Sequence, residues 1–201
     1  MEPKMQIAVQ QLARMRGMTA MYHRQFFADV RFTLVIGIGT VVVAVVYDRR
    51  LIAFLPIIAL IGAAQTAFDA SYLIFARHYA RSLEGYLNRT LKEEILVAAR
   101  LEDAYLFPLD RPKLVTLPLS GGLTWFGFMT ALYTAFGVGF FVVGMILAYD
   151  ALPAQWNDVY LGVMALVTAI SFAVGWMWFW RGEGEARLRA ILDDYPSSVD
   201  G

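Results

Sequence analysis

The sequence predicts an all-α, polytopic membrane protein with four transmembrane helices in two hairpins and long amphipathic cytoplasmic helices. Two observations predict this fold class. Four apolar stretches are each long enough to cross a hydrocarbon core, which needs about 20 residues of helix, and charged residues avoid them almost completely. A soluble helix of such length would carry charge on its wet face, so lipid is the expected solvent. The four stretches are Phe26–Tyr47, Leu51–Ala76, Leu123–Tyr149 and Val159–Trp180.

The composition agrees with a membrane location and excludes several function classes. Hydrophobic residues make up 59% of the chain and charged residues only 17%, against about 25% in soluble domains. The 17 basic and 17 acidic side chains cancel, and no concentrated basic segment indicates a nucleic-acid partner. The chain has no cysteine, which excludes disulfides, thiol catalysis and thiolate metal sites.

The distribution of lysine and arginine predicts the orientation in the membrane. Of the 17 basic residues, only Arg49 and Arg50 lie in the connections that follow the first and third stretches. Because basic residues stay on the cytoplasmic side, both termini and the long middle connection are expected in the cytoplasm. No cleavable signal peptide is evident, since the first apolar run starts only near residue 26. A bacterial inner membrane is the expected location.

Residues 1–25 are expected to form an amphipathic helix before the first hairpin. Apolar residues recur there at steps of three or four, from Met5 through Met15 to Phe26. This segment either lies under the lipid headgroups or packs on the middle connection through its methionine-rich face. The first hairpin then occupies residues 26–76.

The middle connection, residues 77–122, is expected to be helical and to end in a loop. The helical pattern of the second stretch continues beyond Ala76 without a stop signal. Thr90–Glu93 has the spacing of a capping box, which predicts a new helix over Leu91–Phe107. Turn-forming residues then favour a loop, at Pro108, Pro112, Pro118 and Gly121-Gly122. The remaining segments are the second hairpin and a short cytoplasmic tail, at residues 123–180 and 181–201.

The second stretch contains the one carboxylate embedded in an apolar span, Asp69. An ionisable residue inside a membrane costs about 2.5–3.5 kcal/mol on insertion scales and is a functional candidate by default. Gln65 and Tyr72 share its helical face, and Thr66 lies beside them. We interpret this face as a polar stripe that lines a pore or contacts another helix.

A structural ion pair is the alternative interpretation of Asp69. In a hairpin, residues equally far from the connecting turn share one depth. Asp29, Arg31 and Asp69 are therefore expected together near the inner boundary, about 28 Å from the turn at 1.5 Å per residue. Arg31 would then pair with Asp29 or with Asp69, and the pair would need no further function.

The third and fourth stretches carry small and hydroxyl side chains on one face each. Such residues let helix backbones approach closely in lipid, so we expect these faces to pack, with pore lining as the alternative. On the third stretch they are Thr130, Thr134, Gly137 and Gly144, and on the fourth they are Thr168, Ser171 and Gly175.

Enzymatic and cofactor roles are not expected. His23 and His78 are the only histidines, and both lie at the cytoplasmic ends of apolar stretches. They do not supply a haem-binding pair at membrane depth, and zinc would need two or more further ligands nearby. No Ser-His-Asp set, phosphate-binding loop or catalytic pair of carboxylates is evident, so we expect no catalytic residues, no cofactor and no metal.

The leading functional hypothesis is a homo-oligomeric channel or pore, in which the cytoplasmic helices serve assembly or gating. Four helices enclose little polar space, but a ring of copies could place the Asp69 stripe around an axis. The expected partners are the lipid bilayer and further copies of the chain. The alternatives are a membrane-anchored adaptor that recruits a protein partner through its cytoplasmic helices, then a small transporter, then a membrane enzyme that acts on lipid.

Overall fold

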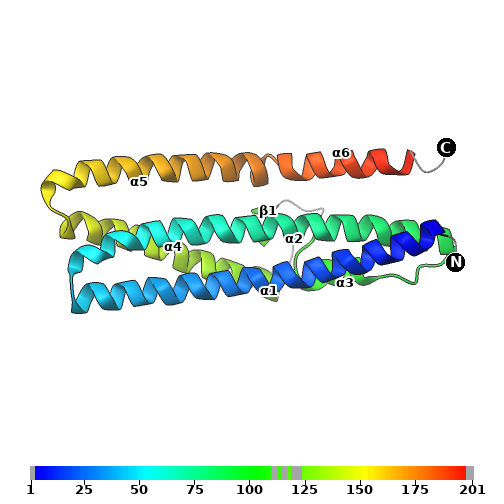
Figure 1. Ribbon diagram of the computed structural model, residues 1–201, viewed down its shortest axis with the longest axis horizontal. Helices are drawn as coiled ribbons and strands as arrows, with labels where there is room; N and C mark the ends of the chain where they lie inside the picture. The colour runs from blue at the N-terminus through cyan, green and yellow to red at the C-terminus, as the bar shows by residue number, and fades with distance from the viewer. Residues whose placement is uncertain (1–2, 110–112, 115–116, 119–123, 198–201) are drawn as a thin grey trace. The chain divides into compact units, whose positions relative to one another are not determined.

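The computed structural model describes residues 3–109, 113–114, 117–118 and 124–197 (Figure 1). In these residues the chain is helical apart from one short antiparallel pair of strands, β1 (Lys113–Leu114) and β2 (Leu117–Pro118). The prediction of an all-helical chain is confirmed. The helices are α1 (Pro3–Val46), the 3-10 helix η1 (Arg49–Phe54), α2 (Leu55–Leu91), α3 (Ala98–Tyr105), α4 (Trp125–Ala151), α5 (Ala154–Gly175), the π-helical turn η2 (Trp176–Trp180) and α6 (Glu183–Ser197).

Four helical runs among the described residues are long and apolar enough to cross a membrane. They are Pro3–Val46, Arg49–Leu91, Trp125–Ala151 and Ala154–Trp180. The structure thus has the helices of an integral membrane protein, as the sequence predicts. The expected start of the third stretch at Leu123 lies outside the described residues, as do Pro112 and Gly121-Gly122 of the expected loop and the end of the tail at 198–201.

Two of the apolar stretches belong to helices that extend well beyond them. The amphipathic segment before residue 26 and the first stretch form one continuous helix, α1. The second stretch continues past Arg77 as far as Leu91 within α2, so the predicted extension of this helix is confirmed. Each of these two helices thus combines an apolar part and a charged part in one continuous helix.

The prediction of a new helix over Leu91–Phe107 is wrong about the residue at which this helix begins. The hydroxyl of Thr90 donates to the carbonyl oxygen of Tyr86 in the preceding turn instead of capping a new helix. Lys92 adopts a left-handed conformation, with φ of 55°, which ends α2. The next helix, α3, begins only at Ala98.

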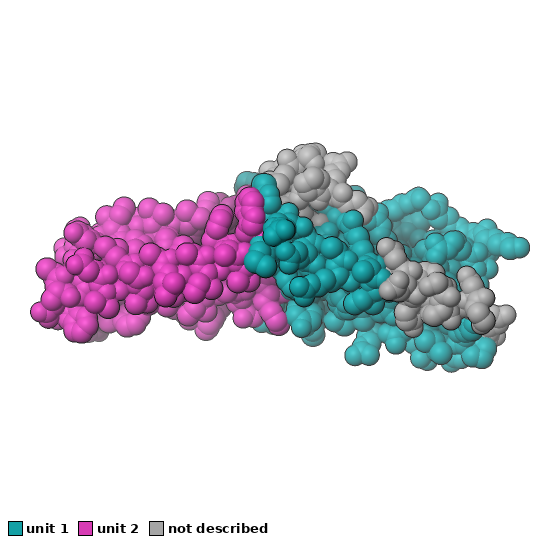
Figure 2. All heavy atoms as spheres, turned by 90° about the horizontal axis from the view of Figure 1, so that it is seen from above, with its two compact units in different colours: residues 1–25, 69–128, 177–201 teal, residues 26–68, 129–176 magenta. Residues whose placement is uncertain are grey.

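The chain divides into two compact units (Figure 2). Unit 1 comprises residues 1–25, 69–128 and 177–201, and unit 2 comprises residues 26–68 and 129–176. Unit 2 contains most of the apolar stretches, whereas unit 1 contains the charged extensions of the helices.

Within unit 2, helices approach closely where one of them carries glycine. Gly62 of α2 lies against Thr33 of α1, where an added Cβ would be 2.5 Å from the threonine Cγ2. Gly144 of α4 lies against Pro56 of α2 in the same way, at 2.8 Å from the proline Cδ. At the end where η1 joins α1 to α2, the Tyr160 hydroxyl of α5 donates to the carbonyl oxygen of Ala53 at 2.9 Å. These contacts hold parts of all four apolar stretches in unit 2.

Unit 1 is built on one face of the α2 extension. Ala76, Ala80 and Leu87 of that face are buried. The amphipathic part of α1 contributes buried side chains at Ala8, Met15 and Thr19, and the chain after α3 contributes Phe107 and Leu109. The segment at the start of the chain therefore packs in the same unit as the middle connection, which is one of the two arrangements expected from its sequence.

Candidate functional site

Arg77, which begins the charged extension of α2, is one of the most buried charged residues described in unit 1 and is only 1% exposed. Its guanidinium donates to Glu102 Oε2 at 3.2 Å, to Asp103 Oδ1 at 2.8 Å and to the carbonyl oxygen of Phe107 at 2.9 Å. The guanidinium carbon also lies 4.6 Å from the centre of the Phe107 ring, within the range of a cation–π interaction. All these partners belong to α3 or to the chain just after it.

Two further arginines bind the same carboxylates. Arg16 of α1 pairs with both Glu84 of α2 and Glu102 of α3, and Arg81 of α2 pairs with Asp103 at 3.0 Å. We call this group the arginine–carboxylate cluster; it consists of Arg16, Arg77, Arg81, Glu84, Glu102 and Asp103. Three positive and three negative side chains balance, and they link α1, α2 and α3 within unit 1.

The polar side chains of α2 also fix the loop and the start of α3. The Asn88 side chain donates to the carbonyl oxygen of Leu96 at 2.9 Å and accepts from the Leu96 amide at 3.0 Å. Glu84 Oε2 accepts from the amide of Ala99 at 3.0 Å. Because the N-cap residue Val97 offers no side-chain acceptor, the Glu84 carboxylate supplies the capping interaction from another helix.

Substitution of Glu84 should therefore loosen α3 in two separable steps. Glu84→Ala removes the acceptor for the Ala99 amide and the partner of Arg16, whereas Glu84→Gln keeps an oxygen acceptor and loses only the charge. Loss of a cap costs about 1 kcal/mol, and loss of the charged partner adds about 1–3 kcal/mol. Hydrogen exchange of the first α3 amides should accelerate about tenfold or more in Glu84→Ala and clearly less in Glu84→Gln. Equal rates in the two variants would contradict the capping role.

His78 connects α2 to the helix near the end of the chain. It is 8% exposed, and its Nε2 lies 3.7 Å from Glu185 Oε2 of α6. Glu185 also pairs with Arg189 one turn further along α6, at 3.4 Å. This contact links α2 to α6 within unit 1.

The predicted polar stripe of α2 divides into buried and exposed residues. Asp69 is 1% exposed and belongs to unit 1, where Tyr72 stacks on the Tyr22 ring with 5.0 Å between ring centres. Gln65 is exposed in unit 2. The Thr66 hydroxyl lies at 2.9 Å from the Gly62 carbonyl oxygen of its own helix. Of these residues, Gln65 and Tyr72 are exposed within an apolar stretch of the single chain, and Tyr72 has the Tyr22 ring stacked on it.

The predicted inner-boundary ion pair has Arg31 and one possible partner, Asp29, on α1 in unit 2, whereas the other possible partner, Asp69, lies on α2 in unit 1. Arg31 is exposed, and its Nε donates to the carbonyl oxygen of Phe27 at 3.2 Å. Asp29 is half-buried, and its backbone oxygen accepts from the Thr33 hydroxyl at 2.8 Å. The pairing of Arg31 with Asp29 or Asp69 stays a prediction.

Only part of the small-residue faces of α4 and α5 packs against other helices of the chain. Gly144 packs closely on Pro56, whereas a Cβ at Gly137 or at Gly175 would meet nothing within 4 Å. The Thr134 hydroxyl donates to the Thr130 carbonyl oxygen of its own helix at 2.8 Å. The stretch of α5 is barely covered, with Met164 as its buried residue in the described chain. Much of the close-packing surface is thus open in a single chain.

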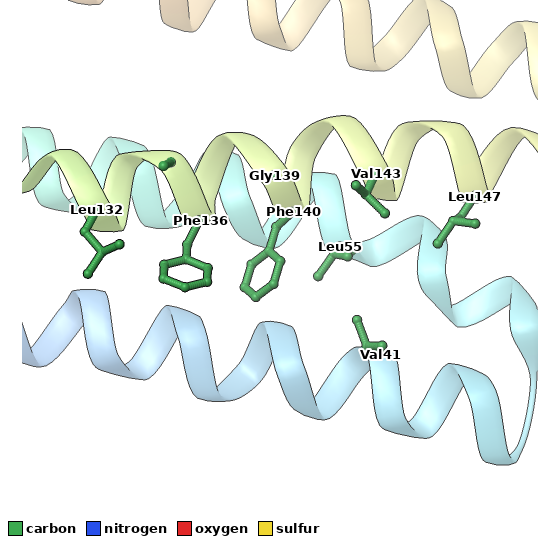
Figure 3. Close-up of a pocket in the computed structure, with 9 residues that line it drawn as sticks. Val41, Leu55, Leu132, Phe136, Gly139, Phe140, Val143 and Leu147 are labelled. Carbon is green, nitrogen blue, oxygen red and sulfur yellow. The ribbon is translucent and has the colours of Figure 1, made fainter.

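Unit 2 also contains an open apolar groove between α1, α2 and α4 (Figure 3). Its volume is about 450 Å³. Figure 3 shows Leu132, Phe136 and Phe140 directed from α4 toward α1, and Val41 directed from α1 toward α4. All the lining side chains are apolar, and the remaining lining residues are Leu55, Ala135, Gly139, Val143 and Leu147.

The described residues contain no group of three or more histidine, aspartate or glutamate side chains that could hold a metal ion. Comparison with known protein families, with curated proteins and with solved structures finds no match.

Sequence reasoning did not identify the arginine–carboxylate cluster. Glu102 and Asp103 look like solvent-facing charges of a cytoplasmic helix, and Arg77 looks like an ordinary basic residue at a membrane boundary. The available signal was the adjacent pair Glu102-Asp103 in α3, whose two carboxylates face Arg77 while Arg100 lies exposed. A charged face on so short a helix could have suggested partners of opposite charge in the neighbouring extension of α2.

Proposed function

We propose that the protein forms a homo-oligomeric channel or pore, with the four apolar helices arranged as two hairpins in a bacterial inner membrane. Both termini and the arginine–carboxylate cluster then lie in the cytoplasm, as the distribution of basic residues favours. In this arrangement unit 1 serves assembly or gating, and unit 2 forms the membrane part of the assembly.

The observation that carries the proposal is the exposure of Gln65 within an apolar helix. Its side chain is exposed in the single chain. The side-chain amide forms no hydrogen bond with any of the described residues. An amide in hydrocarbon without a hydrogen-bond partner costs several kcal/mol. A water-filled lumen or a neighbouring copy would supply the missing partners, whereas surrounding lipid would not.

The open small-residue faces support self-association. Gly137 and Gly175 leave space around their Cα atoms, and the helices that carry them expose apolar residues such as Val138 and Phe172. Small residues allow a second helix to approach closely in lipid. Copies of the chain offer such helices to one another.

Ion flux through liposomes tests the proposal. The reconstituted protein should conduct ions, and Gln65→Leu should reduce the flux by about tenfold or more, equivalent to 1.4 kcal/mol. Gln65→Asn retains an amide and should preserve most of the flux, so it is the matched control. Asp69→Asn then measures whether the buried carboxylate contributes. Absence of flux from the wild-type protein under every gating condition would contradict the channel.

A membrane-anchored adaptor is the second candidate, and the outer face of α3 favours it. Leu101 and Tyr105 of this helix are 57% and 78% exposed, and Ile95 in the preceding loop is 59% exposed. Exposed apolar side chains that lie together can mark a protein-binding surface. Crosslinking in native membranes separates the candidates: a ladder of self-adducts supports the channel, and one dominant adduct with another protein supports the adaptor.

A further inference from the structure

We propose that unit 2 binds one phospholipid with a zwitterionic headgroup. Its acyl chain lies in the apolar groove between α1, α2 and α4, and its phosphate binds Arg49 and Arg50 on the connecting helix η1. This site goes beyond the channel and does not depend on conduction.

The chemistry of the groove fits hydrocarbon. None of the side chains that line the groove can form hydrogen bonds. They belong to α4 between Leu132 and Leu147 and to Val41 and Leu55 on the facing helices. The groove runs along helices that are long and apolar enough to cross a membrane, so acyl chains surround it. A polar ligand would lose its hydration there without gaining partners.

The volume of the groove favours an acyl chain over a helix from a second copy. A helix with its side chains is about 10–12 Å wide, so its cross-section is about 80–110 Å². A volume of about 450 Å³ therefore encloses only about 4–6 Å of a whole helix, roughly one turn, so a second copy would place only side chains in the groove. A chain of methylene groups is far thinner and can follow the groove along several turns of α4.

The groove borders the buried cluster to which the connection with the two arginines contributes. Ile52 of η1 and Leu55 of α2 belong to this cluster, and Val41, Phe140 and Leu147 of the groove pack against it. One end of the groove therefore lies next to the end of unit 2 that carries η1.

Arg49 and Arg50 are placed to meet a phosphate at this end. Both are exposed, and the described residues show no ion pair of either guanidinium. The turn that presents them is fixed, because Asp48 Oδ1 accepts from the Arg50 amide at 2.9 Å. Guanidinium groups match phosphate geometry and can bind it through two parallel hydrogen bonds.

Acidic residues at the same connections determine which headgroup fits. Asp48 adjoins the two arginines, and Asp150 and Asp158 lie at the end of α4 and the start of α5, where Tyr160 binds Ala53 of η1. Together these carboxylates outnumber the arginines. A headgroup with both a phosphate and an amine, such as phosphatidylethanolamine, satisfies both signs of charge, whereas phosphatidylglycerol adds a negative charge without a balancing cation.

Native mass spectrometry of the purified full chain tests the site. The protein is exposed in detergent to equal amounts of phosphatidylethanolamine and phosphatidylglycerol with matched acyl chains. The wild-type protein should retain one phospholipid per chain, mainly phosphatidylethanolamine. Gly139→Trp fills the groove, since a Cβ at Gly139 meets open space, and should lower the retained fraction about tenfold. Val138→Trp, at an exposed neighbour on α4, should retain the lipid.

The double variant Arg49→Gln/Arg50→Gln keeps the groove and tests the headgroup separately. It should retain less of both lipids, because the phosphate loses its partners, and should keep the preference for phosphatidylethanolamine, because Asp48, Asp150 and Asp158 remain. No retained lipid in the wild-type protein, equal retention in Gly139→Trp, or a preference for phosphatidylglycerol would overturn the proposal. Gly139→Trp could instead lower the mass of the oligomer and leave lipid retention unchanged. That result would assign the groove to a second copy of the chain and would also overturn the proposal.

Discussion

Replacement of Arg77 by alanine should detach α3 from α2 and lower the free energy of unfolding of unit 1 by about 3–5 kcal/mol. This is the usual cost of removing one partner from a buried ion pair. Arg77 is 1% exposed and donates to two carboxylates and a backbone oxygen of the α3 region. Without it, Glu102 and Asp103 keep only Arg16 and Arg81 as partners, and the carbonyl oxygen of Phe107 faces a cavity. Hydrogen exchange of residues 98–107 in detergent should accelerate strongly, and thermal unfolding should begin at a lower temperature.

Two further variants make this result specific. Arg77→Lys keeps the positive charge but cannot reproduce three directed hydrogen bonds, so its effect should fall between that of alanine and the wild type. Arg100→Ala removes an exposed pair with Glu94, in which the side chains are 69% and 60% exposed, and should change stability by less than about 1 kcal/mol. Unchanged exchange over α3 in Arg77→Ala would show that the cluster does not hold this helix.

Gly144→Leu should disrupt the contact between α4 and α2 in unit 2. A Cβ at Gly144 would lie 2.8 Å from Pro56 Cδ and 3.1 Å from Leu55 Cβ. The proline ring cannot rotate away, so the helices must separate. Overpacking of this kind costs about 1–3 kcal/mol and occasionally more. The measurement is unfolding in a titration with denaturing detergent.

Gly137→Leu is the matched control for this prediction. It lies two turns earlier on the same helix, and a Cβ there meets nothing within 4 Å. It should leave the stability of the single chain nearly unchanged, although it can alter assembly if copies meet at this face. A loss of stability in Gly137→Leu as large as that in Gly144→Leu would contradict the described packing of α4.

The apolar helices could be predicted from the sequence because their signal is local. Uninterrupted apolar residues over the length of a membrane span identify them without knowledge of any neighbour. The extension of α2 past Arg77 was predictable for the same reason, since the helical pattern continues there. In contrast, the partners of Arg77 lie 25 or more residues away in the chain, and a sequence pattern does not show which distant charges meet.

The end of α2 shows how a tertiary contact overrides a local signal. Thr90–Glu93 has the spacing of a capping box, yet Asn88 binds both backbone groups of Leu96 and holds the chain in a loop. The cap of α3 comes from Glu84, on another helix. Packing also divides the predicted polar stripe of α2. The helical periodicity places Gln65 and Asp69 on one face of this helix, but it does not show which of the two side chains a neighbouring helix covers.

The central claim is that several copies of the chain assemble around Gln65 in a membrane. The most direct test is the mass of the wild-type complex extracted from native membranes with its surrounding lipid. A single assembly of several identical chains is the predicted result. A wild-type complex that contains only one copy of the chain would contradict it.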